Sequence, residues 1–449
     1  MTEARRITVN ATHKKAHLEE LGIVWVFTAE QFKEQVQKFF IGADSAGFIQ
    51  LDDLPEGTTR EYWEAQGYNF FGRWGGEFDE HATPDQPRKE GESALSLVAK
   101  KFGIENDPKF VHMLKWISWL DLNCGRSPFH LGAIVKMMND YDWDSTAVME
   151  WTFTALNAIY AASPKCFGPI TPTAGKFWGA MAREWMFSNF SGRVSVKEFD
   201  RILAIKNPSE VAAALGIGKH PALKRILEFT KERWDGPSGS VFEPHMIAEA
   251  IFYQIGPRAA KEWVFKTLDV IYQQAKDYVL VQFDYQKAKK YMQLVLGGRK
   301  INIVVGESSS LQFSRFARSA PPKGCWAAVV VCKNPVTGNV TISTGLQFQI
   351  DLASTVALLR TEELRARGLS VPSDLPSLQG ENNLVGDVWY FFEKGRMILN
   401  GSTTRTMPPT ALNLDTITGI LFAGIGVGKF KAPAIAPQQL ISASAMASA

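Results

Sequence analysis

The sequence predicts an α/β protein that begins with a parallel sheet flanked by helices. An apolar run at residues 7–11 precedes an amphipathic segment at 18–34, and further apolar runs follow at 36–41 and 68–72. Strand, helix and strand in this order are typical of βαβ units, whose strands are parallel. Helical periodicity fills the middle of the chain, and strand-like runs return after residue 300. We therefore expect a helical middle region and a smaller C-terminal α/β domain.

The composition is that of a globular protein with more than one core. The chain has 449 residues, of which 45% are hydrophobic. Its 49 Lys and Arg nearly balance its 46 Asp and Glu, so the net charge of +3 neither favours nor excludes a nucleic-acid partner. We find no apolar run of about 18 residues, which predicts no membrane span. The four cysteines lack metal-site spacing and no signal-peptide pattern begins the chain, so we expect a cytoplasmic protein with reduced thiols.

Four helices are expected after the first sheet. Gly103 ends the first of them, because glycine adopts the left-handed conformation that closes helices. The four are predicted from apolar residues at helical spacing, and they cover residues 93–102, 107–120, 130–139 and 145–162.

The middle region repeats part of this helical pattern. Residues 98–134 align with 211–247 without a gap, and 150–160 align with 262–272 after a slip of one residue. This similarity predicts a duplicated helical module, with a chance likeness between amphipathic helices as the alternative. The second copy keeps the apolar positions, and we expect it to be structural.

Two histidines and two glutamates follow the first predicted strand. His13, His17, Glu19 and Glu20 place imidazole and carboxylate groups at a strand-to-helix junction. Such mixtures suit Mn, Zn or Fe in the divalent state. The structural alternative is that the histidines end a strand and begin a helix, while the glutamates favour the helix N-terminus electrostatically.

A second group of this kind follows another predicted strand. Asp79, Glu80 and His81 place one of only seven histidines in an acidic setting. Because connections at the ends of parallel strands carry ligand sites, we expect the two groups to converge on one metal ion. Asp121 follows an apolar helix and is a further candidate ligand, with an Asx turn that ends the helix as an equal alternative.

Arginines are the candidate substrate-binding residues. Arg126, Arg318 and Arg405 could hold phosphate, because a guanidinium group matches phosphate oxygens with two hydrogen bonds. The alternative for each is a solvated surface side chain.

Several blocks of the chain resemble the DHH phosphoesterase superfamily. The closest resemblance is to its branch of metal-dependent proteins and nucleases named after a melanocyte-proliferation gene. The blocks that carry it are Thr-His at 12–13 with His-Leu-Glu-Glu at 17–20, Gly-Gly-Glu-Phe-Asp-Glu-His at 75–81, and Leu-Asp-Leu-Asn at 120–123.

The resemblance implies roles for individual residues. Glu80 stands in place of the middle histidine of the Asp-His-His signature, and Phe71 and Gly72 stand where the family has an acidic bridge between two metals. One metal ion, or one tight and one weak, is therefore expected. The smaller domain, with Arg318, Ser402 and Arg405, would hold the substrate. Six metal ligands are implied: His13, His17, Glu19, Asp79, His81 and Asp121.

The implied function is a metal-dependent phosphoesterase. It would cleave short oligonucleotides or a small nucleotide phosphodiester with a metal-activated water, which Glu80 or Glu20 would orient. The implied cofactor is Mn, with Zn, Fe or Mg as alternatives, and no membrane partner is expected. A homodimer is left open. The alternative function is a non-catalytic metal-binding protein that uses its helical module to bind a partner.

The expected domain organisation follows from these assignments and from a change in composition near residue 297. Four segments are expected: a DHH-like metal-binding domain at 1–163, a helical region with the repeated module at 164–296, an α/β substrate domain at 297–430 and a disordered tail at 431–449.

Overall fold

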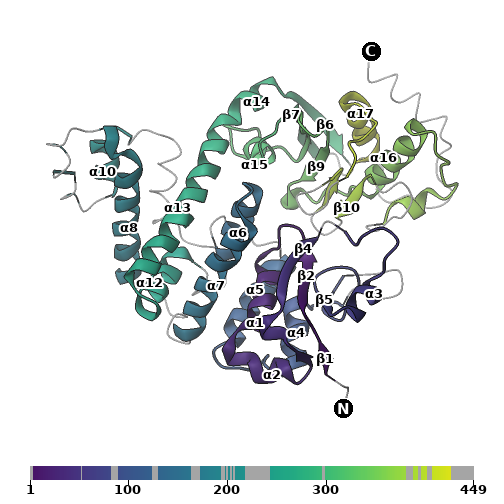
Figure 1. The fold of residues 1–449 in the computed structure, drawn as a ribbon. Coiled ribbons are helices and arrows are strands. Elements are labelled where there is room, and N and C mark those ends of the chain that lie inside the picture. Colours follow the sequence, from purple (N-terminus) through teal and green to yellow (C-terminus); the bar gives the residue numbers. More distant parts are fainter. Residues whose placement is uncertain are drawn as a thin grey trace. The chain divides into compact units, whose positions relative to one another are not determined.

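The structure, a computed structural model, confirms the mixed α/β class (Figure 1). The chain divides into two compact units, Met1–Ala275 and Lys276–Ala449. The expected tail lies outside the described residues. Those residues are 4–51, 53–81, 89–123, 130–162, 172–193, 198, 201–202, 205, 208–217, 243–295, 299–380, 388–392, 396–401 and 407–425.

The first unit contains a parallel sheet, as predicted. Strand β2 (Val9–His13) lies between β4 (Gly47–Leu51) and β5 (Tyr68–Phe70), and both pairings are parallel. The three strands therefore end at one edge of the sheet, where the chain after β2 and the chain after β5 meet. A short helix, α3 (Arg60–Ala65), precedes β5.

The strand predicted at 36–41 is wrong. Val36 is buried in a short helix, α2 (Lys33–Gln37), and only β3 (Phe40–Ile41) is extended. β3 pairs with β1 (Arg5–Arg6) in a separate two-stranded sheet. The neighbour of β2 is instead β4, whose residues are half-buried or exposed and so carry only a weak apolar signal.

The first helix is shorter than the predicted 18–34. Helix α1 (Leu18–Thr28) ends where Ala29 becomes extended, and the 3-10 turn η1 (Glu30–Phe32) follows. Every residue of α1 before Thr28 is buried, because four other helices pack against it. These helices are α4 (Ala94–Phe102), α5 (Val111–Asn123), α6 (Leu131–Asp140) and α7 (Ser145–Ala162).

The proposed repeat has matching local geometry in its two copies. Gly103 and Gly216 both adopt a left-handed conformation, with φ of 66° and 69°. The next residue in each copy donates its N–H to an equivalent helical carbonyl, that of Ala99 at 3.0 Å and that of Ala212 at 2.9 Å. The helices after α7 are α8 (Pro172–Phe190), α10 (Pro208–Ala214), α12 (Pro244–Gln254) and α13 (Pro257–Leu280).

The match extends beyond the aligned residues to α1 and α8. The Trp25 indole donates to Asn157 at 2.7 Å, and the Trp185 indole donates to Asp269 at the same distance. Asn157 and Asp269 are related by the shift of 112 residues that aligns 150–160 with 262–272. These paired hydrogen bonds are of the kind that a duplicated helical module would give, and the duplication stays a prediction.

The second unit is built on a six-stranded mixed sheet with the strand order β10-β11-β9-β8-β7-β6. Helices α16 (Ala353–Ala366) and α17 (Leu414–Gly424) share one apolar core with the sheet. Helices α14 (Gln282–Lys287) and α15 (Phe313–Arg318) share another. The strands are β6 (Lys289–Val295), β7 (Arg299–Glu307), β8 (Val329–Lys333), β9 (Val340–Thr344), β10 (Tyr390–Phe392) and β11 (Met397–Leu399).

Strand β6 pairs with β7. The boundary expected between residues 296 and 297 therefore falls between two strands of one sheet. Among the described helices, none is both long and apolar enough to span a bilayer.

Candidate metal centre

The connection between β2 and α1 brings His13 and His17 together. His13 is the last residue of β2, and His17 immediately precedes α1. Between them Lys15 has a φ of 59°, a left-handed conformation that bends the chain sharply. The side chain of Gln50 accepts the Lys15 N–H at 2.6 Å, and Asn139 donates to the Ala16 carbonyl at 2.8 Å. The bend is therefore held from the neighbouring strand and from α6.

Glu20, in the first turn of α1, joins the two histidines. Its Oε1 lies 3.2 Å from Nε2 of His13, and its Oε2 accepts the backbone N–H of His17 at 2.7 Å. Ligand atoms of His13, His17 and Glu20 lie within 4.8 Å of one another. His13 and Glu20 are buried, whereas His17 is exposed, so the group has a solvent-facing side.

The bend after β5 leaves room for Glu20. Gly72 has a φ of 69°, and a Cβ atom at this position would lie 3.0 Å from Oε1 of Glu20. Any larger residue would both strain the backbone and crowd the carboxylate. The bend at Gly72 thus makes space for the Glu20 carboxylate.

The His13–Glu20 contact shifts the pKa of both side chains. Burial alone would lower the pKa of His13, but the adjacent Glu20 carboxylate outweighs it and the pKa is raised. Burial alone would raise the pKa of Glu20, but the charge of His13 and its hydrogen bond lower it. The pair thus favours an ionised carboxylate beside an imidazole.

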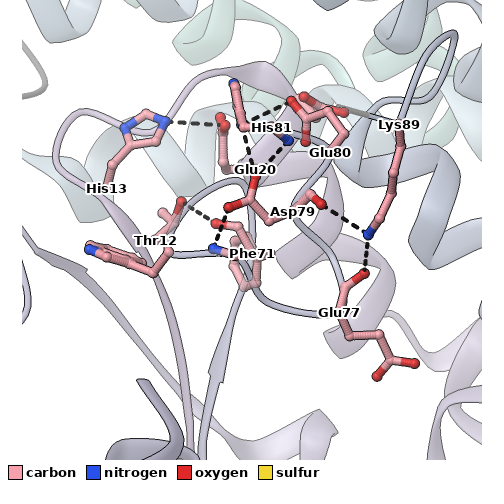
Figure 2. A network of polar contacts seen from close by, with 12 residues as sticks. Thr12, His13, Glu20, Phe71, Glu77, Asp79, Glu80, His81 and Lys89 are labelled. Carbon is pink, nitrogen blue, oxygen red and sulfur yellow. Dashed lines mark hydrogen bonds and ion pairs between the residues drawn. The ribbon is translucent and has the colours of Figure 1, made fainter. Parts of the chain in front are cut away.

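Asp79 is held by local hydrogen bonds and holds His81 in turn. Its Oδ2 accepts the Gly75 N–H at 2.6 Å, and its Oδ1 lies 2.9 Å from both the backbone nitrogen and Nδ1 of His81. Lys89 donates to the backbone carbonyls of Glu77 and Asp79, at 3.2 and 3.0 Å. Figure 2 shows these residues beside His13 and Glu20. A carboxylate at Nδ1 fixes the imidazole orientation and directs Nε2 outward.

Three carboxylates form a further group. Oxygens of Glu19, Glu80 and Asp121 lie within 4.8 Å of one another. The backbone N–H of Leu95 donates to Glu19 at 2.9 Å. Oε2 of Glu80 is buried and has no hydrogen-bond partner among the described residues. Burial, followed by the nearby carboxylates, raises the pKa of Glu19 well above its usual range, and burial raises that of Glu80.

These groups are linked through shared and adjacent residues. Glu80 belongs to the carboxylate group and also lies with Asp79 and His81 in a third group of potential ligands. Glu19 and Glu20 are neighbours in α1 but serve different groups. Glu20 was expected to orient water, but its carboxylate lies beside the histidines. Glu19 was expected to bind the metal together with the histidines, but it lies with Glu80 and Asp121.

The predicted substrate residues lie elsewhere. Arg318 is the last residue of α15, in the second unit. Arg126, Ser402 and Arg405 lie outside the described residues.

The sequence analysis missed Gln50 and Asn139, which hold the bend between the histidines. Neither residue is near the site in sequence, and polar side chains in a strand and a helix gave no signal of their roles. Comparison with known proteins adds no assignment: no family model, curated protein or solved structure matches the chain.

Proposed function

We propose that the protein is a metal-dependent phosphoesterase that cleaves short oligonucleotides or a small nucleotide phosphodiester. The observation that carries the proposal is the convergence of His13, His17 and Glu20 at the end of β2. The resemblance to the DHH phosphoesterase superfamily supports it, and two of the blocks that carry this resemblance, at 12–20 and 75–81, follow strands of a parallel sheet. The DHH-like arrangement of the first unit is part of this proposal.

The donor atoms fit a divalent transition metal. Two imidazoles and one carboxylate suit Mn, Zn or Fe, and the adjacent carboxylates would also accept Mg. Burial and mutual proximity raise the pKa values of Glu19 and Glu80 in the carboxylate group, and a bound cation would favour their ionised forms. A divalent ion bound here would polarise the phosphoryl oxygen and lower the pKa of a bound water.

The residues have distinct proposed tasks. His13, His17 and Glu20 would hold the ion, and the Asp79 carboxylate at Nδ1 of His81 fixes the orientation of that imidazole ring. Glu80, whose Oε2 has no hydrogen-bond partner among the described residues, would orient the attacking water and accept its proton. Glu80 would thus act where the family signature has a histidine.

The test is hydrolysis of bis(p-nitrophenyl) phosphate and of a diadenylate by the full chain with added Mn²⁺. We expect turnover by the wild type and a loss of at least about a hundredfold in His13→Ala and Glu20→Gln. The matched control is His112→Ala, which removes an exposed histidine of α5 outside the site. Metal binding without turnover of either substrate would favour the non-catalytic alternative.

A further inference from the structure

A buried carboxylate and a buried imidazole face each other at the start of α12. Glu243 immediately precedes this helix and is 5% exposed, and His245 in its first turn is 8% exposed. Oε2 of Glu243 lies 3.3 Å from Nε2 of His245. The contact lacks the geometry of a hydrogen bond, and neither atom has a hydrogen-bond partner among the described residues. Because buried polar atoms without partners are costly, the pair points to a ligand that both atoms share.

Glu243 stands at the cap position of α12 but does not cap the helix. An N-cap side chain usually accepts a backbone N–H of the first turn, and the side chain of Glu243 makes no such bond. The aligned residue of the first copy in the predicted repeat is His130, the N-cap of α6. Nδ1 of His130 accepts the Ala133 N–H at 3.1 Å. The Glu243 carboxylate therefore faces His245 instead of the end of its helix.

The position of His245 also differs between the two aligned segments. Its counterpart is Gly132, where an added Cβ atom would lie 3.2 Å from Cε1 of His130. The first segment thus leaves little room for a side chain where the second has an imidazole. The Glu–His pair is therefore not a requirement of the repeated helical packing, and the structural role expected for the second copy does not explain it.

The spacing of the two atoms fits ligands of one metal ion. A carboxylate oxygen and an imidazole nitrogen bound to a tetrahedral Zn²⁺, each at about 2.0–2.2 Å from the ion, lie roughly 3.4 Å apart. A charge-assisted hydrogen bond would instead bring the two atoms to about 2.7–2.9 Å. The observed 3.3 Å between Glu243 and His245 is close to the first value. Imidazole nitrogen and carboxylate oxygen are both common ligands of Zn²⁺.

We propose that Glu243 and His245 form a second metal site, which binds Zn²⁺ with water in the remaining coordination positions. Two protein ligands hold an ion less tightly than the three of the candidate centre at His13, His17 and Glu20. Zn²⁺ is preferred to Mn²⁺, because nitrogen and oxygen sites bind Mn²⁺ more weakly than Zn²⁺. An ion bound here stabilises the folded chain, since the unfolded chain does not hold the two ligands together. The inference goes beyond the proposed function and does not depend on it.

The test is isothermal titration of Zn²⁺ into the full chain carrying His13→Ala and Glu20→Gln, which removes the first candidate centre. We expect a site whose affinity falls by about tenfold or more when Glu243→Gln or His245→Gln is added. The controls are Glu262→Gln and His112→Ala, which remove an exposed carboxylate and an exposed imidazole and should leave this affinity unchanged. Circular dichroism melting would show that each variant is folded.

His245→Cys in the same background gives a second readout, because a thiolate is also a zinc ligand. With Co²⁺ as the spectroscopic substitute for Zn²⁺, this variant should show a thiolate-to-cobalt charge-transfer band that His112→Cys does not show. Absence of this band would overturn the inference, as would a Zn²⁺ affinity that neither glutamine variant changes. A background protein that binds no Zn²⁺ would overturn it too. Since that background lacks the first centre, none of these outcomes decides the proposed function.

Discussion

Trp151 and Trp263 stack with their ring centroids 4.7 Å apart and their planes 6° from parallel. Each indole N–H donates to the backbone carbonyl of the other residue, at 3.2 and 3.1 Å. The two residues hold equivalent positions in α7 and α13 under the shift of 112. This reciprocal contact is what a two-fold relation between two copies of a module requires.

Replacing either tryptophan should cost similar stability. Trp151→Phe and Trp263→Phe each keep a ring but remove a buried indole hydrogen bond and part of the stacked ring, so we expect each to lower the free energy of unfolding by about 1–3 kcal/mol. Urea unfolding measures this, with Trp326→Phe, at an exposed position of the second unit, as the control. The double variant should lose less stability than the sum of the losses in the two single variants, since the two residues are in contact. A large cost in only one variant would argue against the symmetric pair.

The helix ends of the predicted repeat could be located from sequence because they rest on local signals. Gly103 and Gly216 end helices, and apolar residues recur at helical spacing, so periodicity alone locates these elements. The strand beside β2 could not be located, because the half-buried residues of β4 lack a strong apolar pattern. The symmetric partner of Trp25 was also missed, since Trp185 lies 160 residues away, outside the shift that relates the other helices.

Asp79→Asn should weaken metal binding without removing a direct histidine ligand. The carboxylate at Nδ1 of His81 fixes the ring, and loss of such a partner commonly reduces metal affinity by about 10–100-fold. Isothermal titration with Mn²⁺ measures the change. Glu77→Gln, at an exposed residue of the same block, is the control. Equal affinities of wild type and Asp79→Asn would show that His81 needs no such support.

Glu243 should make stability fall as the pH rises. Burial raises the pKa of Glu243 from 4.5 to about 7, so between these values the folded chain binds a proton that the unfolded chain has released. The contribution of Glu243 to stability therefore decreases from pH 4.5 to 7, and Glu243→Gln should remove this contribution of up to about 3 kcal/mol. Urea unfolding at pH 5 and pH 8 measures this change in the free energy of unfolding. The control is Glu262→Gln, at an exposed residue. The expectation would be contradicted if the difference in the free energy of unfolding between wild type and Glu243→Gln did not grow from pH 5 to pH 8.

Glu363 should have the opposite pH dependence. It accepts hydrogen bonds from the Trp389 indole at 3.1 Å, the Ala411 N–H at 2.9 Å and Arg367 at 2.7 Å. Burial alone would raise its pKa, but these hydrogen bonds lower it, so its stabilising effect is present above about pH 4.5 and is lost as the pH falls. Glu363→Gln should cost about 1.5–3 kcal/mol at pH 7.

The measurement for Glu363 is urea unfolding of the full chain at pH 7 and pH 3.5. Its control is Glu362→Gln, at a half-buried neighbour that pairs with Arg365. The cost of Glu363→Gln should shrink at the lower pH, because pH 3.5 lies below the ordinary pKa of 4.5, where the stabilising effect of this carboxylate is being lost. An equal cost at both pH values would contradict the assignment.

The candidate site could be predicted from sequence only as a set of residue types. His13, His17 and the Asp-Glu-His block were expected to lie together because they follow parallel strands. The choice between Glu19 and Glu20 depends on the direction of each side chain from the first turn of α1. Spacing alone does not determine that direction, because the space that Gly72 leaves for Glu20 and the hydrogen bond from Leu95 to Glu19 involve residues far along the chain.

The central claim is that His13, His17 and Glu20 hold a divalent metal ion. The most direct measurement is electron paramagnetic resonance titration of Mn²⁺ into metal-free full-length protein, which counts the bound ions. We predict a tight site for about one ion per chain in the wild type and in His112→Ala, and loss of that site in His13→Ala, His17→Ala and Glu20→Gln. A folded wild type that binds no Mn²⁺, Zn²⁺ or Fe²⁺, or the same tight site in all three variants, would contradict the claim.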